Sequence, residues 1–142
     1  MALPAHIRLE FVTPERPIVH EDVDEVELPG ERGDFGVLPG HAPLLSELKP
    51  GQLSYTVGNV THYVMVSWGF AEVLPDRVTI LVQASERPEE IDVERARRAK
   101  QRAEERLSKP AEAELDRERA QAALERAMAR LEVANRVAVA QT

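Results

Sequence analysis

Cysteine is missing from this chain of 142 residues, and that absence removes several chemistries at once. Without it the chain can form no disulfide, no thiolate nucleophile and no zinc–thiolate site. Any metal ligation would have to come from other side chains. The absence of cysteine also suits a protein of the reducing cytoplasm.

Long apolar runs are missing as well. The opening segment MALPAHIRLEF has no basic region followed by an apolar core, and nowhere do 18 uninterrupted apolar residues occur. We therefore expect neither a signal peptide nor a membrane span. Any association with a membrane would have to run through another protein.

Signatures of common enzymes are absent too. The sequence contains no GxxxxGK[ST] phosphate loop, no GxSxG elbow and no HExxH pair, and its four histidines are scattered. The glycines between residues 30 and 40 do not match GxGxxG and lead into a strand rather than a helix, so they are not expected to cradle a phosphate. We expect a non-catalytic protein without a metal site.

Charge and composition divide the chain in two. Residues 1–87 carry 13 acidic and 6 basic side chains, whereas residues 88–142 carry 12 of each, and all seven glycines and all six aromatic residues lie at or before Phe70. An acidic first part argues against nucleic-acid binding, which depends on neutralising phosphates with lysine and arginine. We predict a head, residues 1–87, and a differently built tail, residues 88–142.

The head has the pattern of short strands. Apolar and polar residues alternate over 7–11 and 60–67, which predicts strands with one buried face, whereas 78–82 is apolar on both faces and is expected to lie between two layers. Proline and glycine pairs separate these runs, and Gly58–Asn59 is the clearest hairpin turn. Many short strands and tight turns favour an antiparallel β-sandwich or flattened barrel.

The tail has the pattern of two helices. Asp92 is a good N-cap for a first helix, which Ser108-Lys109-Pro110 ends, and a second helix is expected to start near 111–113. The short link makes the helices an antiparallel hairpin, so the predicted fold class is α+β. The apolar stripe expected along the two helices consists of Val93, Ala96, Ala103, Leu107, Leu115, Ala123, Leu124, Ala127, Met128, Leu131 and Ala134.

Much of that stripe is alanine, which buries little area. At roughly 25 cal/mol per Å² such a seam stabilises weakly unless the hairpin rests on something else. We therefore expect the hairpin to be able to change position, with folded-back and extended arrangements differing by only a few kcal/mol.

The most informative stretch is ERGDFGVLPGHAPLL, that is Glu31-Arg32-Gly33-Asp34-Phe35-Gly36-Val37-Leu38-Pro39-Gly40-His41-Ala42-Pro43-Leu44-Leu45. It closely resembles the epsilon subunit of rotary F-type ATP synthases, a family with a G-[ED]-[LF]-G-[IV]-L-P-G-H-x-P-L segment in its sandwich. The resemblance extends from Ile7 to Leu131. Supporting matches are Val12-Thr13-Pro14, Gly69-Phe70-Ala71-Glu72-Val73, Val78-Thr79-Ile80-Leu81 and Ile91-Asp92-Val93-Glu94-Arg95-Ala96.

This resemblance implies a non-catalytic rotor subunit. Its head would contact the gamma subunit and the c-ring, so that proton-driven rotation of the ring reaches the catalytic alpha/beta hexamer. Its place would be peripheral, on the cytoplasmic face of the bacterial cell membrane. The helical hairpin would extend along gamma and inhibit ATP hydrolysis, and arginines such as Arg117, Arg119 and Arg136 would then meet acidic loops of the beta subunits.

Three residues are implied as partner contacts. The resemblance places the loop of Asp34 at the c-ring and the region of His41 near gamma. Trp68 departs from the family, which usually has Ser-Gly-Gly where this chain has Ser67-Trp68-Gly69. By chemistry alone, Asp34 is an ordinary solvated charge, His41 a hydrogen-bonded structural histidine, and Trp68 either a partly buried cover of the sandwich edge or an interface residue.

A regulatory ATP site is implied as well, because Ile91-Asp92-x-x-Arg95-Ala96 matches the family's I/L-D-x-x-R-A signature. The residues carried over by position are Glu86, Ile91, Asp92, Arg95, Ala96, Arg102, Arg126 and Arg130. Arginine forks suit phosphate oxygens, and a carboxylate can accept from the adenine amino group. Bound ATP would favour the folded-back hairpin without being hydrolysed, as a regulatory ligand rather than a required cofactor.

Plainer explanations stay open for this second motif. Asp92 is accounted for as an N-cap, and Arg95 and Arg102 are accounted for as solvated charges on one face of a helix. A function of another class also stays open, a stand-alone ATP-sensing regulatory protein that signals through its hairpin. Co-purification with a gamma-like partner separates the two functions.

Overall fold

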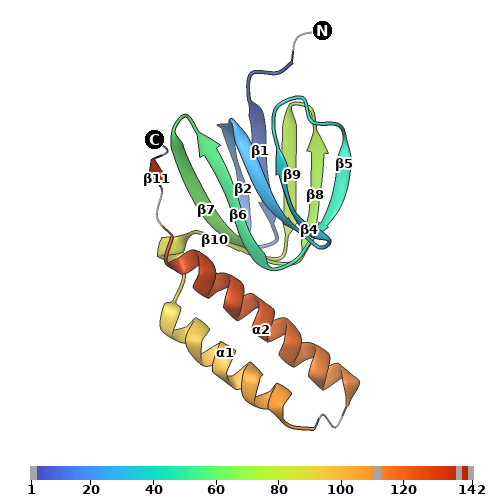
Figure 1. Cartoon of the computed structure of the whole chain (residues 1–142), viewed down its shortest axis with the longest axis vertical. Coiled ribbons are helices and arrows are strands. Elements are labelled where there is room, and N and C mark those ends of the chain that lie inside the picture. The colour runs from blue at the N-terminus through green and yellow to red at the C-terminus, as the bar shows by residue number, and fades with distance from the viewer. Residues whose placement is uncertain (1–2, 111–112, 137–138, 141–142) are drawn as a thin grey trace.

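The computed structural model describes residues 3–110, 113–136 and 139–140. A head of strands is followed by two helices that form an arm beneath it (Figure 1). The strands are β1 (Ile7–Thr13), β2 (Arg16–Val23), β3 (Glu25–Gly30), β4 (Gly33–Val37), β5 (Leu44–Leu48), β6 (Gly51–Val57), β7 (Val60–Val66), β8 (Gly69–Leu74), β9 (Arg77–Val82), β10 (Ser85–Glu86) and β11 (Val139–Ala140). A short 3-10 helix η1 (Pro88–Glu90) precedes α1 (Val93–Ser108) and α2 (Glu114–Ala134).

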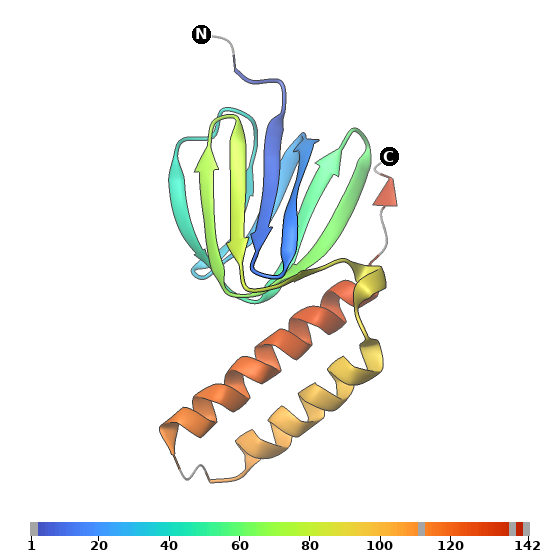
Figure 2. The ribbon, with the colours of Figure 1, turned by 180° about the vertical axis from the view of Figure 1, so that it is seen from behind.

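The strands form one sheet that folds over into two layers. Their order is β10-β7-β6-β3-β5-β8-β9-β1-β2, with β4 beside β3 and β11 beside β7. The bend falls between β3 and β5, which meet in a single pair, Gly30 with Leu48. Figure 2 shows from behind the layer that contains β1, β2, β8 and β9. The predicted sandwich and helical hairpin are confirmed, although β1 pairs with β9 in parallel rather than antiparallel.

The core of the sandwich follows from alternation along the strands. Ile7 and Leu9 on β1 are fully buried, and Phe11 packs against the same core. The Gly58–Asn59 turn joins β6 to β7 as predicted, with Gly58 at a φ of 62° that favours glycine. Alternation therefore identified these strands and the direction of their buried faces.

Two strand predictions are wrong in detail. The outward face of β9 is not covered: Leu81 is 44% exposed, while Val78 and Ile80 point into the core. Conversely, β7 is buried on both faces near its end, because Met65 is fully buried beneath the arm. Periodicity cannot say which sheet face a separate element will cover.

The two helices are antiparallel neighbours, with a seam made mostly of alanine. Asp92 caps α1, since its Oδ1 accepts a hydrogen bond from the backbone N–H of Arg95 at 3.1 Å. The second helix begins at Glu114, just after the predicted 111–113, of which 111 and 112 lie outside the described residues. The buried alanines of the arm are Ala96, Ala103, Ala120, Ala127 and Ala129. Leu115 and Met128, predicted in the stripe, are more than half exposed.

The arm is folded back against the head, and α2 lies along β6 and β7 (Figure 1). A small apolar cluster, which we call the joint, consists of Met65, Ile91, Ala129 and Val133. The prediction missed Ala129 and Val133 because they lie on a second face of α2, directed at the sheet. Within the described residues, neither helix has the length and apolarity needed to cross a membrane.

A further strand follows the helices. The segment Val139–Ala140, within the part expected to be helical, forms β11 and pairs antiparallel with Thr61 and Val60 at one end of β7. At the other end of β7, Val66 and Met65 pair with β10. The two short strands therefore lie along the same outer edge of the sheet.

Candidate functional site

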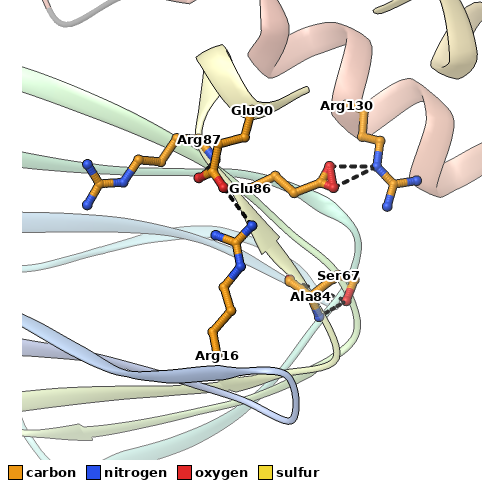
Figure 3. A network of polar contacts seen from close by, with 7 residues as sticks. All are labelled: Arg16, Ser67, Ala84, Glu86, Arg87, Glu90 and Arg130. Atoms are coloured by element: carbon orange, nitrogen blue, oxygen red, sulfur yellow. Dashed lines mark hydrogen bonds and ion pairs between the residues drawn. The ribbon is translucent and has the colours of Figure 1, made fainter. Parts of the chain in front are cut away.

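The register of β10 directs Glu86 at the arm. Glu86 lies opposite Met65 in the antiparallel β7–β10 pair, and residues directly opposite share a face. Because α2 covers Met65, the Glu86 carboxylate meets Arg130 of α2, whose Nε donates to Oε1 at 2.8 Å and Oε2 at 3.2 Å (Figure 3). These side chains are 21% and 30% exposed, so solvent screens their attraction less than at an open surface.

A second ion pair fastens the linker to the head. Arg16 of β2 approaches Glu90 of η1 with Nη2 2.6 Å from Oε2, and the other carboxylate oxygen of Glu90 accepts from the backbone N–H of Arg87 at 3.1 Å (Figure 3). The hydrogen bond from Arg16 holds the pKa of Glu90 below its ordinary value, and Glu90 in turn raises the pKa of Arg16. Both groups therefore stay charged wherever the protein is folded near neutral pH.

Trp68 also lies where the head meets the arm. Its carbonyl accepts from the backbone N–H of Gln83 at 3.1 Å, and the neighbouring Ser67 Oγ accepts from the N–H of Ala84 at 2.9 Å. The guanidinium carbon of Arg126 on α2 is 5.5 Å from the centre of the Trp68 ring. Trp68 is thus half-buried and contacts the chain's own arm.

Three of the predicted nucleotide contacts serve the local structure. Ile91 is only 8% exposed and belongs to the joint, and Ala96 is buried at 3% exposure. Asp92 uses one carboxylate oxygen to cap α1. The Ile-Asp-x-x-Arg-Ala signature therefore coincides with the point where the arm leaves the head.

The remaining predicted contacts fall into two groups. The structure brings together Glu86 with Arg130 and places Arg126 one helical turn before Arg130. It does not bring Arg95 or Arg102 into this group: both are exposed, and neither side chain forms a hydrogen bond or ion pair with any residue that the structure describes. Their guanidinium donors face solvent.

Asp34 and His41 lie in different regions of the head. Asp34 is exposed on β4 and lines a groove between head and arm, together with Lys49, Lys100 and Met128. His41 follows Gly40, whose backbone N–H bonds to the carbonyl of the β8–β9 turn, at the end of the head remote from the helices (Figure 1). The Nδ1 of His41 lies 2.7 Å from the carbonyl oxygen of Ala42, a local contact within the loop.

Sequence reasoning missed other contacts that hold the arm. Arg16 was not singled out, and neither were Tyr63 and Gln52, which receive Arg136: its guanidinium lies 5.1 Å from the Tyr63 ring centre, and its Nε donates to Gln52 Oε1 at 3.1 Å. The sequence carries only a weak signal for these contacts, because the residues that form them lie far apart in the chain. Among the residues described, no group of three or more histidines and carboxylates is placed to hold a metal ion.

Comparison with known proteins assigns both parts of the chain. Residues 6–88 match the family model "ATP synthase, Delta/Epsilon chain, beta-sandwich domain", and residues 89–135 match the corresponding "long alpha-helix domain". This chain belongs to the ATP synthase delta/epsilon family. The membership confirms the resemblance seen in the sequence, and it places the chain among non-catalytic stalk subunits.

Individual relatives agree with this family. The ATP synthase epsilon chain of Syntrophobacter fumaroxidans is 53% identical over 130 residues, covering 92% of this chain and 96% of its own length. The epsilon chain of Koribacter versatilis is 56% identical over 98 residues, 69% of each chain.

Solved structures show the same fold. A chain of the Euglena gracilis mitochondrial ATP synthase, solved with its c-ring, has a TM-score of 0.82 and 29% identity, covering 96% of this chain and 85% of its own. A chain from the central stalk and c-ring of the Tetrahymena thermophila enzyme has a TM-score of 0.64 at 15% identity, covering 91% and 96%, which shows the fold alone.

Proposed function

We propose that this epsilon chain works as a rotor subunit on the cytoplasmic face of a bacterial membrane. Its head binds the gamma subunit and the c-ring, so that proton-driven rotation of the ring reaches the alpha/beta hexamer. The observation that carries the proposal is the match of both head and helices to one ATP synthase family. A stand-alone ATP sensor receives no support from that match. Purification from cells tests the difference: the rotor function requires a stable complex containing gamma.

The surface of the head supports docking to larger partners. Large apolar side chains lie exposed on it, and Phe70 and Leu81, each about 45% exposed, are directly paired across β8 and β9. Neighbouring apolar side chains on an outward sheet face are typical of protein interfaces. Asp34, exposed on β4, is the proposed c-ring contact, and His41 is the proposed gamma contact. Assembly with the c-ring unchanged by Asp34→Lys would remove the first of these roles.

The arm is proposed to regulate ATP hydrolysis by leaving the head. The joint has only four buried residues, of which Ala129 has a small side chain and Ile91 is still 8% exposed. The seam between the helices is mostly alanine. A contact of this size allows two arrangements that differ by a few kcal/mol. Truncation after Arg87 keeps β1 to β10 and removes both helices. It is expected to raise hydrolysis by the assembled complex severalfold, and an unchanged rate would contradict inhibition.

ATP is proposed to stabilise the folded-back arm by bridging the two helices. The support is the Ile-Asp-x-x-Arg-Ala signature together with Arg126 and Arg130, which α2 holds one turn apart, with Arg130 paired to Glu86. Arg95 and Arg102 are free to turn their donors toward phosphate oxygens. Equilibrium dialysis at millimolar ATP tests binding, and no uptake would end this part of the proposal. At 100 times its dissociation constant, ATP would add about 2.7 kcal/mol to the folded-back form.

A further inference from the structure

The chain has a single tryptophan, and the arm contacts it directly. Trp68 follows β7 at a sharp change of direction, where the Gln83–Trp68 and Ala84–Ser67 hydrogen bonds fix the backbone. Its ring therefore has a rigid support on the head. The partner, Arg126, comes from α2, so the contact exists only while the arm is folded back.

The contact is part of a row along one face of α2. Arg126 and Arg130 are four residues apart and project from the same side of the helix, toward Trp68 and Glu86. Figure 3 shows Arg130 reaching Glu86, with Ser67, the residue before Trp68, nearby on the head. The head thus offers an aromatic face and a carboxylate to two successive arginines.

We propose that Trp68 is an anchor that holds the arm in the folded-back position by binding the guanidinium of Arg126. A cation over an indole face is attracted by the negative face of the ring, and the attraction is stronger for Trp than for other aromatic residues. Because the apolar joint is small, this contact is needed beside the Glu86–Arg130 ion pair and the Arg136 contacts to keep the arm in place. The anchor acts without nucleotide, but it rests on the proposed ability of the arm to leave the head.

The absence of cysteine supplies a clean reporter for arm opening. Ala129 is 3% exposed and packs in the joint, so the thiol of an Ala129→Cys chain is shielded while the arm is docked. A water-soluble disulfide reagent, applied to the full chain without ATP, then modifies it at a rate proportional to the open population. All variants are compared in this background.

Paired variants distinguish the contribution of the aromatic face of Trp68 from that of its apolar bulk. Trp68→Leu keeps an apolar side chain but removes the ring, and it is expected to raise the modification rate roughly three- to tenfold. Trp68→Phe keeps a ring and is expected to stay closer to the parent. Arg126→Gln is expected to match Trp68→Leu, and the double variant should be no faster than either single one, because both remove the same contact. Arg119→Gln, an exposed arginine of the same helix, is the matched control and is expected to leave the rate unchanged.

Trp68 is also its own reporter, since no other tryptophan contributes to the emission. Arg126→Gln should shift that emission to longer wavelength as the ring gains access to water, and Arg119→Gln should not. This measurement does not alter the head, so it holds even if a Trp68 variant folds poorly.

Two negative outcomes are distinguishable. In the first, the thiol becomes accessible in the parent chain, but Trp68→Leu and Arg126→Gln leave its modification rate unchanged or have effects that simply add. The proposed role of Trp68 as an anchor is then wrong, whereas the proposed mobility of the arm is kept. If the thiol is modified in every variant only as fast as the head unfolds, the arm does not open, and the proposed regulation fails together with the anchor.

Discussion

Gly69, the first residue of β8, lies too close to its neighbouring strand for any side chain. A Cβ built there would overlap the carbonyl oxygen of Leu81 and lie 2.8 Å from the Cα of Val82, both backbone atoms of β9. Backbone in a paired strand cannot move aside without breaking the ladder. The requirement for glycine here comes from close approach and not from an unusual dihedral angle.

Gly69→Ala is therefore expected to lower the free energy of unfolding by about 2 kcal/mol, within the range for overpacking. Urea denaturation followed by circular dichroism measures it. Gly36→Ala is the control, because a Cβ at Gly36 meets nothing within 4 Å and its backbone dihedral is ordinary. Equal stability of the two variants would contradict the argument.

Tyr55 makes the stability of the head sensitive to alkali. Burial raises its pKa from 10 to about 12. In the unfolded chain the phenol ionises near pH 10 while the folded protein retains the proton, so the free energy of unfolding is unaffected below pH 10 and falls between about pH 10 and 12. The loss approaches about 3 kcal/mol, at 1.36 kcal/mol per pKa unit.

This dependence is measured by urea denaturation at a series of pH values. In the Tyr55→Phe variant, most of the decline in the free energy of unfolding between pH 10 and 12 is expected to disappear. If that variant and the parent lose stability in parallel over the same interval, another group is responsible.

At the scale of elements, the start of α1 combines two roles in one residue. The Asp92 carboxylate caps the helix, and Asp92 is also among the residues proposed to contact ATP. Asparagine can also cap a helix but carries no charge, whereas alanine neither caps a helix nor carries a charge. The two substitutions therefore separate helix stability from nucleotide recognition.

Asp92→Ala is expected to destabilise α1 by about 1 kcal/mol, and Asp92→Asn by much less. Hydrogen exchange of the first-turn amides of α1 measures the cap, and equilibrium dialysis with ATP measures binding. The cap interpretation predicts faster exchange in the alanine variant alone. Loss of ATP binding in both variants would show that the charge is needed for the ligand; retention in the asparagine variant would show that it is not.

At the scale of the whole molecule, the arm depends on a few residues of the joint. Val133 is fully buried between α2 and the head, whereas Leu115 near the other end of α2 is 54% exposed. Deleting buried methyl groups costs both transfer free energy and a cavity, and deleting exposed ones costs little. The two positions therefore have opposite importance for docking, although they lie on one helix.

Val133→Ala is expected to weaken docking of the arm by about 1 to 3 kcal/mol and to leave the core of the head intact. Hydrogen exchange resolved by residue is the measurement: amides of α1 and α2 should exchange faster, and those of β1 and β9 should not. Leu115→Ala is the control and should change neither set. Uniform acceleration across head and arm would show instead that the chain unfolds as one unit.

Much of this architecture could be predicted from the sequence. Alternation around Ile7 and Leu9, the Gly58–Asn59 turn and the Asp92 cap each depend on neighbours within a few residues, and each was predicted correctly. The nucleotide residues were predicted as one group, but among them the structure joins only Glu86 and Arg130 through a contact between two side chains. The contact of Trp68 with Arg126 was not predictable, since the two residues lie 58 positions apart in the chain.

The sequence alone determined the class of protein through its family motifs. It also determined the division into head and hairpin, three of the strands and the start and end of the first helix, because propensity, periodicity and capping act over a few residues. Only the tertiary structure decided where the arm lies, that Met65 rather than Leu81 is covered, and which arginines of α2 meet the head. Those outcomes depend on how two separately specified units pack together. Since that packing joins residues far apart in the chain, no local pattern encodes it.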